Sequence, residues 1–143
     1  MKINVLRNIS AVFVLVGVIV LSSCGGSVAS DPHHTFDSDG AKTSAQDYYQ
    51  LLVNGQTRDY VNAISASDTM DSTMYNQMCD LVSQYLAHED EVHHGLKAAT
   101  ATGDSLNIQD SLATVFLDVT YGDSTTEHIS LPLKFHNGMW RIK

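Results

Sequence analysis

Cysteine, positive charge and long apolar runs are all scarce in this chain of 143 residues. Its two cysteines, Cys24 and Cys79, are too few for a disulfide framework, so a hydrophobic core must stabilise the fold. Eight Lys and Arg residues stand against 16 Asp and Glu residues, which gives a formal net charge of −8. Because phosphate contacts need clustered Lys and Arg, this composition argues against nucleic-acid binding.

The apolar run at the N-terminus is too short to be a comfortable membrane span. It extends from Ile9 to Leu21 and contains about 13 residues, whereas a bilayer-spanning helix needs about 20. Lys2 and Arg7 precede it, and the first acidic residue is Asp31. A basic start followed by a short apolar segment is typical of a signal peptide.

The segment Leu21-Ser22-Ser23-Cys24 follows the apolar run and resembles the lipobox of bacterial lipoproteins. The resemblance implies cleavage between Ser23 and Cys24 and a lipid attached to the Cys24 thiol. It further implies an exported domain tethered to the membrane of the bacterial cell envelope. Gly25 stands where Asp would signal retention in the inner membrane, which favours the outer membrane. The alternatives are an ordinary secretory signal with a chance cysteine and a single-pass anchor.

Removing residues 1–23 would change both the charge and the thiol content of the chain. The remaining 120 residues carry six Lys and Arg against 16 acidic residues, a formal charge of −10. Anionic headgroups would repel such a domain, so we expect the lipid on Cys24 to supply the membrane affinity. Cys79 would then be the one remaining thiol. Its place in a helical pattern indicates a small buried hydrophobe, rather than intermolecular pairing or catalysis.

A tether and three helices are predicted for the first part of the exported chain. Residues 24–42 contain few large apolar side chains and many Ser, Gly and Asp, which favours a flexible tether. A single domain follows over residues 43–143, and its first helix is expected to start at the N-cap Ser44 and stop at Gly55. A short helix is predicted in residues 57–65, and a longer one from Asp68 or Thr69 to about Ala87. The core-facing stripe of the longer helix would consist of Met74, Met78, Leu81, Val82 and Tyr85.

Beyond residue 95 the apolar period changes from 3.6 to 2, which indicates β-strands. Residues 96–102 are a weak strand candidate, and residues 111–122 and 127–135 are stronger ones. Asn137-Gly138 is a signal for a type I′ hairpin that pairs Phe135 with Trp140 and Leu133 with Ile142. The sequence therefore predicts an α+β fold: N-terminal helices packed on one face of an antiparallel sheet of about four strands.

Two motifs in this layout are similar to the nuclear transport factor 2-like (cystatin-like) superfamily. They are Ala45, Tyr48, Leu51 and Gly55 in the first helix, and Asn137, Gly138, Trp140, Arg141 and Ile142 at the end. Within the superfamily, the chain most resembles small bacterial lipoproteins classed as domains of unknown function. The resemblance implies a curved sheet that wraps the first helix like a cone, with a pocket at its open end. Some members are isomerases, dehydratases or cyclases, others bind ligands or partners without chemistry, and homodimers through the open sheet face are common.

Isomerase-type chemistry needs a pocket carboxylate as a base and an acidic hydrogen-bond donor such as tyrosine. Most acidic residues fall near helix starts, and Asp118 alternates away from the apolar face, towards an exposed face shared with His128. We therefore expect no catalytic residue and no cofactor. The predicted domain binds a small molecule or an envelope protein, and its pocket candidates are Tyr48, Tyr60, Tyr121 and Trp140. The alternative is a small isomerase or dehydratase, which a carboxylate within hydrogen-bonding reach of one of these tyrosines would favour.

The His-rich segment HEDEVHH, residues 88–94, raises a second question, which is metal binding. Zinc ligands must converge, and the segment lacks the helical H-E-x-x-H spacing. We expect a solvated loop between two elements and no metal site, and the role of the segment stays open. Its histidines would also permit a pH-sensitive function.

Three of the six positive charges of the exported chain fall on the outer face of the final hairpin. A small docking patch and an ordinary solvated sheet face both explain such charges, and the second explanation is the commoner one. The residues are Lys134, Arg141 and Lys143.

Overall fold

The computed structural model describes residues 35–143. The predicted signal peptide, Cys24 and the first part of the predicted tether lie outside the described residues. Within them, no helix is long and apolar enough to cross a membrane. The helices are α1 (Ser38–Val53), α2 (Thr57–Ala63), the short 3₁₀ helix η2 (Ser67–Thr69) and α3 (Ser72–His93).

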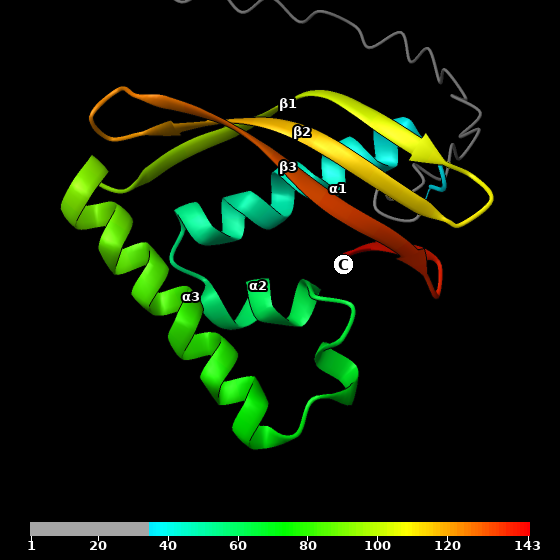
Figure 1. Ribbon diagram of the computed structural model, residues 1–143, viewed down its shortest axis with the longest axis horizontal. Helices are drawn as coiled ribbons and strands as arrows, with labels where there is room; N and C mark the ends of the chain where they lie inside the picture. The colour runs from blue at the N-terminus through cyan, green and yellow to red at the C-terminus, as the bar shows by residue number, and fades with distance from the viewer. Residues whose placement is uncertain (1–34) are drawn as a thin grey trace, which may run out of the picture.

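The strands are β1 (Leu96–Asn107), β2 (Leu112–Tyr121), β3 (Thr126–His136) and β4 (Met139–Ile142). They form a four-stranded antiparallel sheet in the order β1-β2-β3-β4. The sheet lies over α1, and α2 and α3 lie on the same side of it (Figure 1). A register shift between Ala101 and Gly103 adds local twist to β1. The predicted α+β meander is confirmed.

The final hairpin has the predicted register. Asn137 and Gly138 both have positive φ, at 51° and 80°, as a type I′ turn requires. Phe135 pairs with Trp140 and Leu133 with Ile142. The turn fixes this register because both of its residues must enter the left-handed region, and Asn and Gly do so at the lowest cost.

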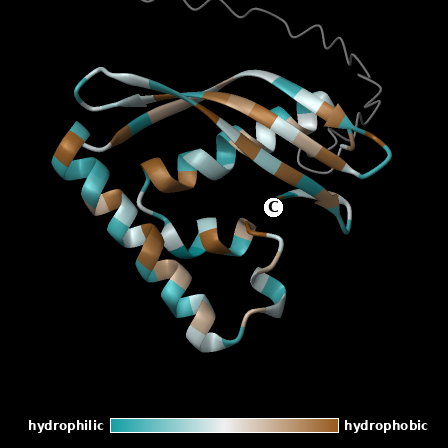
Figure 2. Cartoon of the chain, viewed as in Figure 1, coloured by the Kyte–Doolittle hydropathy of each residue, from teal (hydrophilic) through white to brown (hydrophobic). Residues whose placement is uncertain are grey.

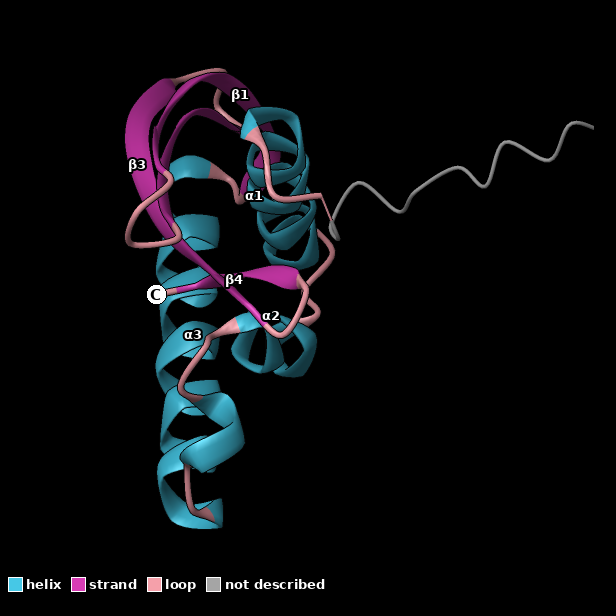
Figure 3. Cartoon of the chain, turned by 90° about the vertical axis from the view of Figure 1, so that its right-hand side faces the viewer, coloured by secondary structure: helices cyan, strands magenta, loops and turns pink. Residues whose placement is uncertain are grey.

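The core lies between α1 and the concave face of the sheet (Figures 2 and 3). Buried positions alternate along β2 with less buried ones, of which Phe116 is exposed, as in a sheet with one covered face. The α1 surface that meets the sheet is made of small side chains, which lets the helix approach the strands closely. The fully buried residues include Ala41, Ser44, Ala45, Val115, Leu117, Leu133 and Trp140.

Helix α1 begins earlier than predicted, at Ser38 rather than Ser44. Asp37 is its N-cap, and its carboxylate accepts a hydrogen bond of 2.7 Å from the Gly40 N–H. Residues 38–42, predicted as the end of the tether, are therefore helical. The sequence does not predict this first part of α1, because its buried face carries Gly40, Ala41 and Ser44 instead of large apolar residues. The predicted stop is confirmed, since Gly55 has φ +69° and its N–H bonds to the Leu52 carbonyl.

Helix α3 differs from its prediction in length and in the face that it buries. It starts after the N-cap Asp71 and continues to His93, so the segment 88–93, predicted as a loop, is helical. Cys79 and Val82 are buried, and Cys79 is a free thiol. Met74 and Leu81, predicted to face the core, are 53% and 60% exposed. The core face is instead the neighbouring stripe of Tyr75, Met78, Cys79, Val82 and Leu86.

Candidate functional site

Two of the four predicted pocket residues lie within the packed interior. Trp140 is fully buried, and its indole N–H donates to the Thr35 carbonyl at 2.9 Å. Its ring stacks with Phe36 and meets Phe135 edge-on, at 5.5 and 5.2 Å between centroids. The Tyr48 hydroxyl donates to the Trp140 carbonyl. Both residues therefore hold β4 and the start of the described chain together.

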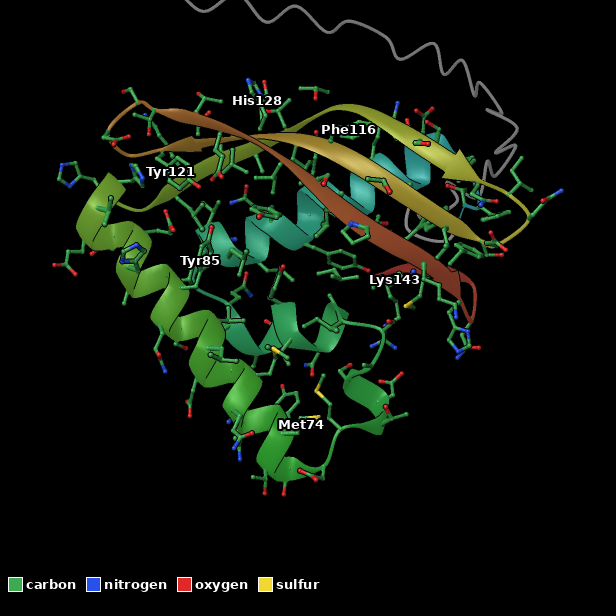
Figure 4. All side chains as sticks on the ribbon, viewed as in Figure 1. Met74, Tyr85, Phe116, Tyr121, His128 and Lys143 are labelled. Carbon is green, nitrogen blue, oxygen red and sulfur yellow. The ribbon has the colours of Figure 1, made fainter. Side chains whose placement is uncertain are left out.

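The other two predicted residues, Tyr60 and Tyr121, belong to a tyrosine cluster that four elements build. We use this name for Tyr49 of α1, Tyr60 of α2, Tyr85 of α3 and Tyr121 of β2. Tyr85 and Tyr121 lie at the same end of the molecule, on facing elements (Figure 4), and Tyr85 contributes to the raised pKa of Tyr121. Tyr121 is only 3% exposed. Burial raises the pKa of all four side chains above the ordinary value of 10.0.

A carboxylate completes the cluster at its solvent edge. The Tyr121 hydroxyl donates to Glu127 at 2.7 Å, and this bond adds to burial in raising the Tyr121 pKa. Glu127 is opposite Val119 in the β2–β3 ladder and points to the same side of β3 as Ile129, yet its side chain is exposed. No acidic residue was predicted on an interior position. The alternation of Ile129, Leu131 and Leu133 reaches Glu127 when it is continued two residues towards the N-terminus, so the strand pattern contains the signal for this position.

The end of α3 is fastened beside this cluster by the β2–β3 turn. His93 Nδ1 lies 2.9 Å from Asp123 Oδ2, and the His93 ring packs on Tyr121 at 4.8 Å between centroids. The Thr125 hydroxyl and N–H donate to the other Asp123 oxygen at 2.6 and 2.9 Å. These donors, with His93, hold the pKa of the Asp123 carboxyl well below its usual range. The contact fixes Tyr85 relative to Tyr121.

A hollow of about 290 Å³ opens between the ends of α1 and α3 and the start of β1. Its apolar wall contains Leu52, Val53, Leu86 and Leu96, and its polar groups come from Asp90 and His94. None of the four predicted pocket residues lines it. The hollow is concave and combines apolar with polar groups, although its lining is more polar than that of most small-molecule sites.

The Tyr121–Glu127 pair has the two groups that isomerase-type chemistry uses, but in mutual contact. The Tyr121 proton is donated to Glu127, so it does not point at a position that a substrate oxygen could occupy. A substrate would have to break this bond before tyrosine could donate to it and carboxylate could accept its proton. The observed geometry therefore supports a structural contact more directly than a poised acid–base pair.

The His-rich segment does not assemble a metal site within residues 35–143. No group of three His, Cys, Asp or Glu side chains in this range converges as metal ligands would. The His93 ring interacts with the Asp123 carboxylate. His94 is the C-cap of α3 and has the left-handed conformation, with φ 60°.

Asp118 and His128, which were predicted to share the outer face of the sheet, contact each other on that face. His128 Nδ1 lies 2.6 Å from Asp118 Oδ1, on the opposite surface of the sheet from α1 (Figure 4). The predicted common face of these residues is confirmed.

Arg141 does not belong to an exposed docking patch. Its side chain is 13% exposed and pairs with Asp68 of η2. The guanidinium also donates to the carbonyls of Asn62 and Ile64, at 2.6 and 3.1 Å, and to the Ser67 hydroxyl at 2.9 Å. It fastens the segment after α2 to β4.

The comparisons with known proteins agree with this architecture. A crystal structure from Campylobacter jejuni, described provisionally as an NTF2-like transpeptidase, superposes with a TM-score of 0.55. The match covers 68% of this chain and 92% of that one, at 15% sequence identity. This chain has the nuclear transport factor 2-like fold. No family model matches the sequence, and no curated protein matches it either.

The fold assignment accounts for the position of the candidate groups. In this nuclear transport factor 2-like domain the concave sheet face covers α1, and the tyrosine cluster and the hollow both lie where α1 and α3 end. The same fold serves unrelated activities, so the site residues must decide the function.

Proposed function

We propose that the chain is an exported lipoprotein whose nuclear transport factor 2-like domain binds a ligand or an envelope protein without catalysing a reaction. In this proposal residues 1–23 are a signal peptide, and lipid on Cys24 anchors the domain, with the outer membrane favoured over the inner one. The domain requires no cofactor. A branch of small bacterial lipoproteins of unknown function is the proposed family.

The observation that carries the binding proposal is the hollow beside the tyrosine cluster. It has a volume of about 290 Å³, an apolar wall that includes Leu52 and Leu86, and polar groups from Asp90 and His94. Tyr121 and Glu127 hydrogen-bond to each other, and neither residue lines the hollow.

Transpeptidation through a cysteine, one reading of the provisional description of the Campylobacter jejuni protein, finds little support. Such a reaction needs an accessible nucleophile. Cys79, the cysteine of the described residues, is 8% exposed and packs against Leu52, Val61 and Val82.

The second candidate is a small isomerase or dehydratase, which the 2.7 Å contact between Tyr121 and Glu127 favours. It would require the substrate to separate the two side chains. Titration with 4-nitrophenol, a stable analogue of an enolate, tests this candidate. A phenolate spectral shift that is lost in Tyr121→Phe would support the enzyme, whereas no shift would support binding alone.

Anchoring is tested by Cys24→Ser in the full chain, with Cys79→Ser as the matched control. We expect Cys24→Ser to lose palmitate labelling and to leave the membrane fraction, and Cys79→Ser to keep both. Labelling and membrane association that survive Cys24→Ser would refute the lipid anchor.

Ligand or partner binding is tested by a photo-crosslinking residue at Val53, in the hollow, and by the same residue at His128 as the control. A discrete adduct from Val53 alone is the expected result in cells. Equal labelling from both positions, or none from Val53, would refute the hollow as the binding site.

A further inference from the structure

Helix α3 carries a second apolar stripe that the domain does not cover. Met74, Leu81, Tyr85 and Val92 are 53%, 60%, 37% and 50% exposed. Their spacings are seven, four and seven residues. With Met78 and His88 between them, the spacing alternates regularly between four and three. This is the a/d pattern of a heptad repeat, here called the α3 stripe.

The α3 stripe lies beside the face that packs in the domain and shares Met78 with it. The core face contains Cys79 and Val82, which are buried, and the partly buried Tyr75, Met78 and Leu86. At 100° per residue, the α3 stripe is turned by roughly 100° from that face. Met74 and Tyr85 mark two points along it in Figure 4, and apolar residues recur along the whole of α3 in Figure 2.

We propose that the α3 stripe is a homodimer interface, in which α3 packs antiparallel against α3 of a second copy of this chain. The pattern is symmetric about a point between Leu81 and Tyr85. An antiparallel pair would place Leu81 against Tyr85 of the copy, Met78 against His88 and Met74 against Val92. Every contact then occurs twice, as a two-fold interface requires.

The charges of α3 favour an antiparallel over a parallel pair. The helix has no Lys or Arg, and three of its four acidic residues are consecutive near its end, Glu89, Asp90 and Glu91. A parallel pair would bring the two acidic ends together. An antiparallel pair places Glu91 beside the neutral Gln77 of the copy and opposes the two helix dipoles.

The exposed apolar residues favour α3 over the open sheet face as the dimer surface. Among the described residues, the large exposed hydrophobics number seven, of which four lie on the α3 stripe. Phe116, at 45% exposure, is the one on the outer sheet face, and the paired Asp118 and His128 lie near it. The α3 stripe covers about 27 Å along the helix axis, which suits a small and reversible dimer.

Single cysteines introduced into the full chain in cells, treated with a short bismaleimide, test this geometry. Gln84 flanks the stripe at its centre, so Gln84→Cys should cross-link to its own copy. Gln77→Cys and Glu91→Cys should each fail alone, because a residue lies about 21 Å from its own equivalent. The two variants should cross-link when they are expressed together. Asn76→Cys, on the polar side of α3, is the matched control, and the buried Cys79 is common to every variant.

Adding Leu81→Gln to Gln84→Cys should abolish the cross-link and leave the circular dichroism unchanged, since Leu81 is largely exposed. Cross-linking of Gln77→Cys alone would show a parallel pair and overturn the proposal. So would a cross-link from Ser130→Cys on the outer sheet face in place of Gln84→Cys, or no cross-linked dimer from any variant. The inference does not depend on the proposed lipid anchor or on the hollow.

Discussion

The Tyr121 hydroxyl donates a hydrogen bond of 2.7 Å to the Glu127 carboxylate and so joins a buried ring to an exposed acid. The two residues lie on adjacent strands, on the side of the sheet that faces the helices. Tyr85 reaches Tyr121 from α3, and the His93 ring packs against it. The contact therefore links the open end of the sheet to the last turns of the longest helix.

Removing this bond should weaken the domain modestly. Because Glu127 is exposed, water replaces part of the lost interaction, and we expect Tyr121→Phe to lower the free energy of unfolding by about 0.5–1.5 kcal/mol. Glu127→Gln should cost less, since an amide oxygen can still accept the Tyr121 proton. Urea denaturation measures both. A Tyr121→Phe protein as stable as the wild type would contradict a structural role for the contact.

Alkaline pH should unfold the domain when its tyrosines ionise. Burial raises the pKa of five tyrosines above 10.0. A raised pKa contributes stability that is complete below the unfolded value, about 10, and is lost as the pH rises through the folded value. Phenolate absorbance should therefore appear together with the loss of circular dichroism. Reversible ionisation of these five tyrosines near pH 10 with intact dichroism would contradict this. The five are Tyr48, Tyr49, Tyr60, Tyr85 and Tyr121.

Acid pH should remove the contribution of Asp123 to stability. Its pKa is held well below the ordinary value of 3.8, so the stabilisation is complete above that value and is lost as the pH falls towards the folded pKa. Asp123→Asn should be less stable than the wild type at pH 7, and the difference in urea midpoint should shrink below about pH 4. Thr125→Val should reproduce part of the loss, because it removes one donor. A difference that is constant from pH 7 to pH 3 would rule out this role of the ionised carboxylate.

The hairpin and the strands were predictable because their signals are local. Asn137-Gly138 specifies the turn, and a two-residue turn then pairs Phe135 with Trp140 without further information. The start of α1 was not predictable in the same way. Its buried face uses Gly40, Ala41 and Ser44, and small residues give no apolar period unless the approaching sheet is already known.

The candidate site was predictable in part. Tyr121 follows from strand alternation, and the same alternation reaches Glu127, the first residue of the predicted strand 127–135. The contact with Tyr85 depends on where α3 ends relative to the β2–β3 turn, which sequence periodicity does not encode. The stripe of Met74 and Leu81 was misassigned to the core because an exposed heptad has the same apolar pattern as a buried one.

Arg141 should contribute more to stability than its place on an edge strand suggests. It donates to two carbonyls and a hydroxyl of the segment after α2 and pairs with Asp68. We expect Arg141→Ala to lower the free energy of unfolding by about 1.5–3 kcal/mol, since the donors are charged and mostly shielded from water. Lys143→Ala, two residues along and exposed, is the control and should change little. Equal stability of both variants would contradict the proposed fastening of η2 to β4.

Gly122, directly after β2 in the β2–β3 turn, should tolerate a methyl group poorly. A Cβ at this position would lie 2.1 Å from the His94 carbonyl oxygen and 2.8 Å from the carbonyl carbon, both backbone atoms that cannot rotate away. The Gly122 N–H also bonds to the Gly95 carbonyl at 2.8 Å, so α3 and the β2–β3 turn would have to separate. We expect Gly122→Ala to lower the free energy of unfolding by about 1–3 kcal/mol.

Gly103→Ala is the matched control, because its Cβ would meet only the Phe116 ring at 3.7 Å, an ordinary contact distance. Urea denaturation compares the two, and hydrogen exchange at the end of α3 should be faster in Gly122→Ala alone. Unchanged exchange there, or equal losses in both variants, would contradict a close packing of α3 against the turn.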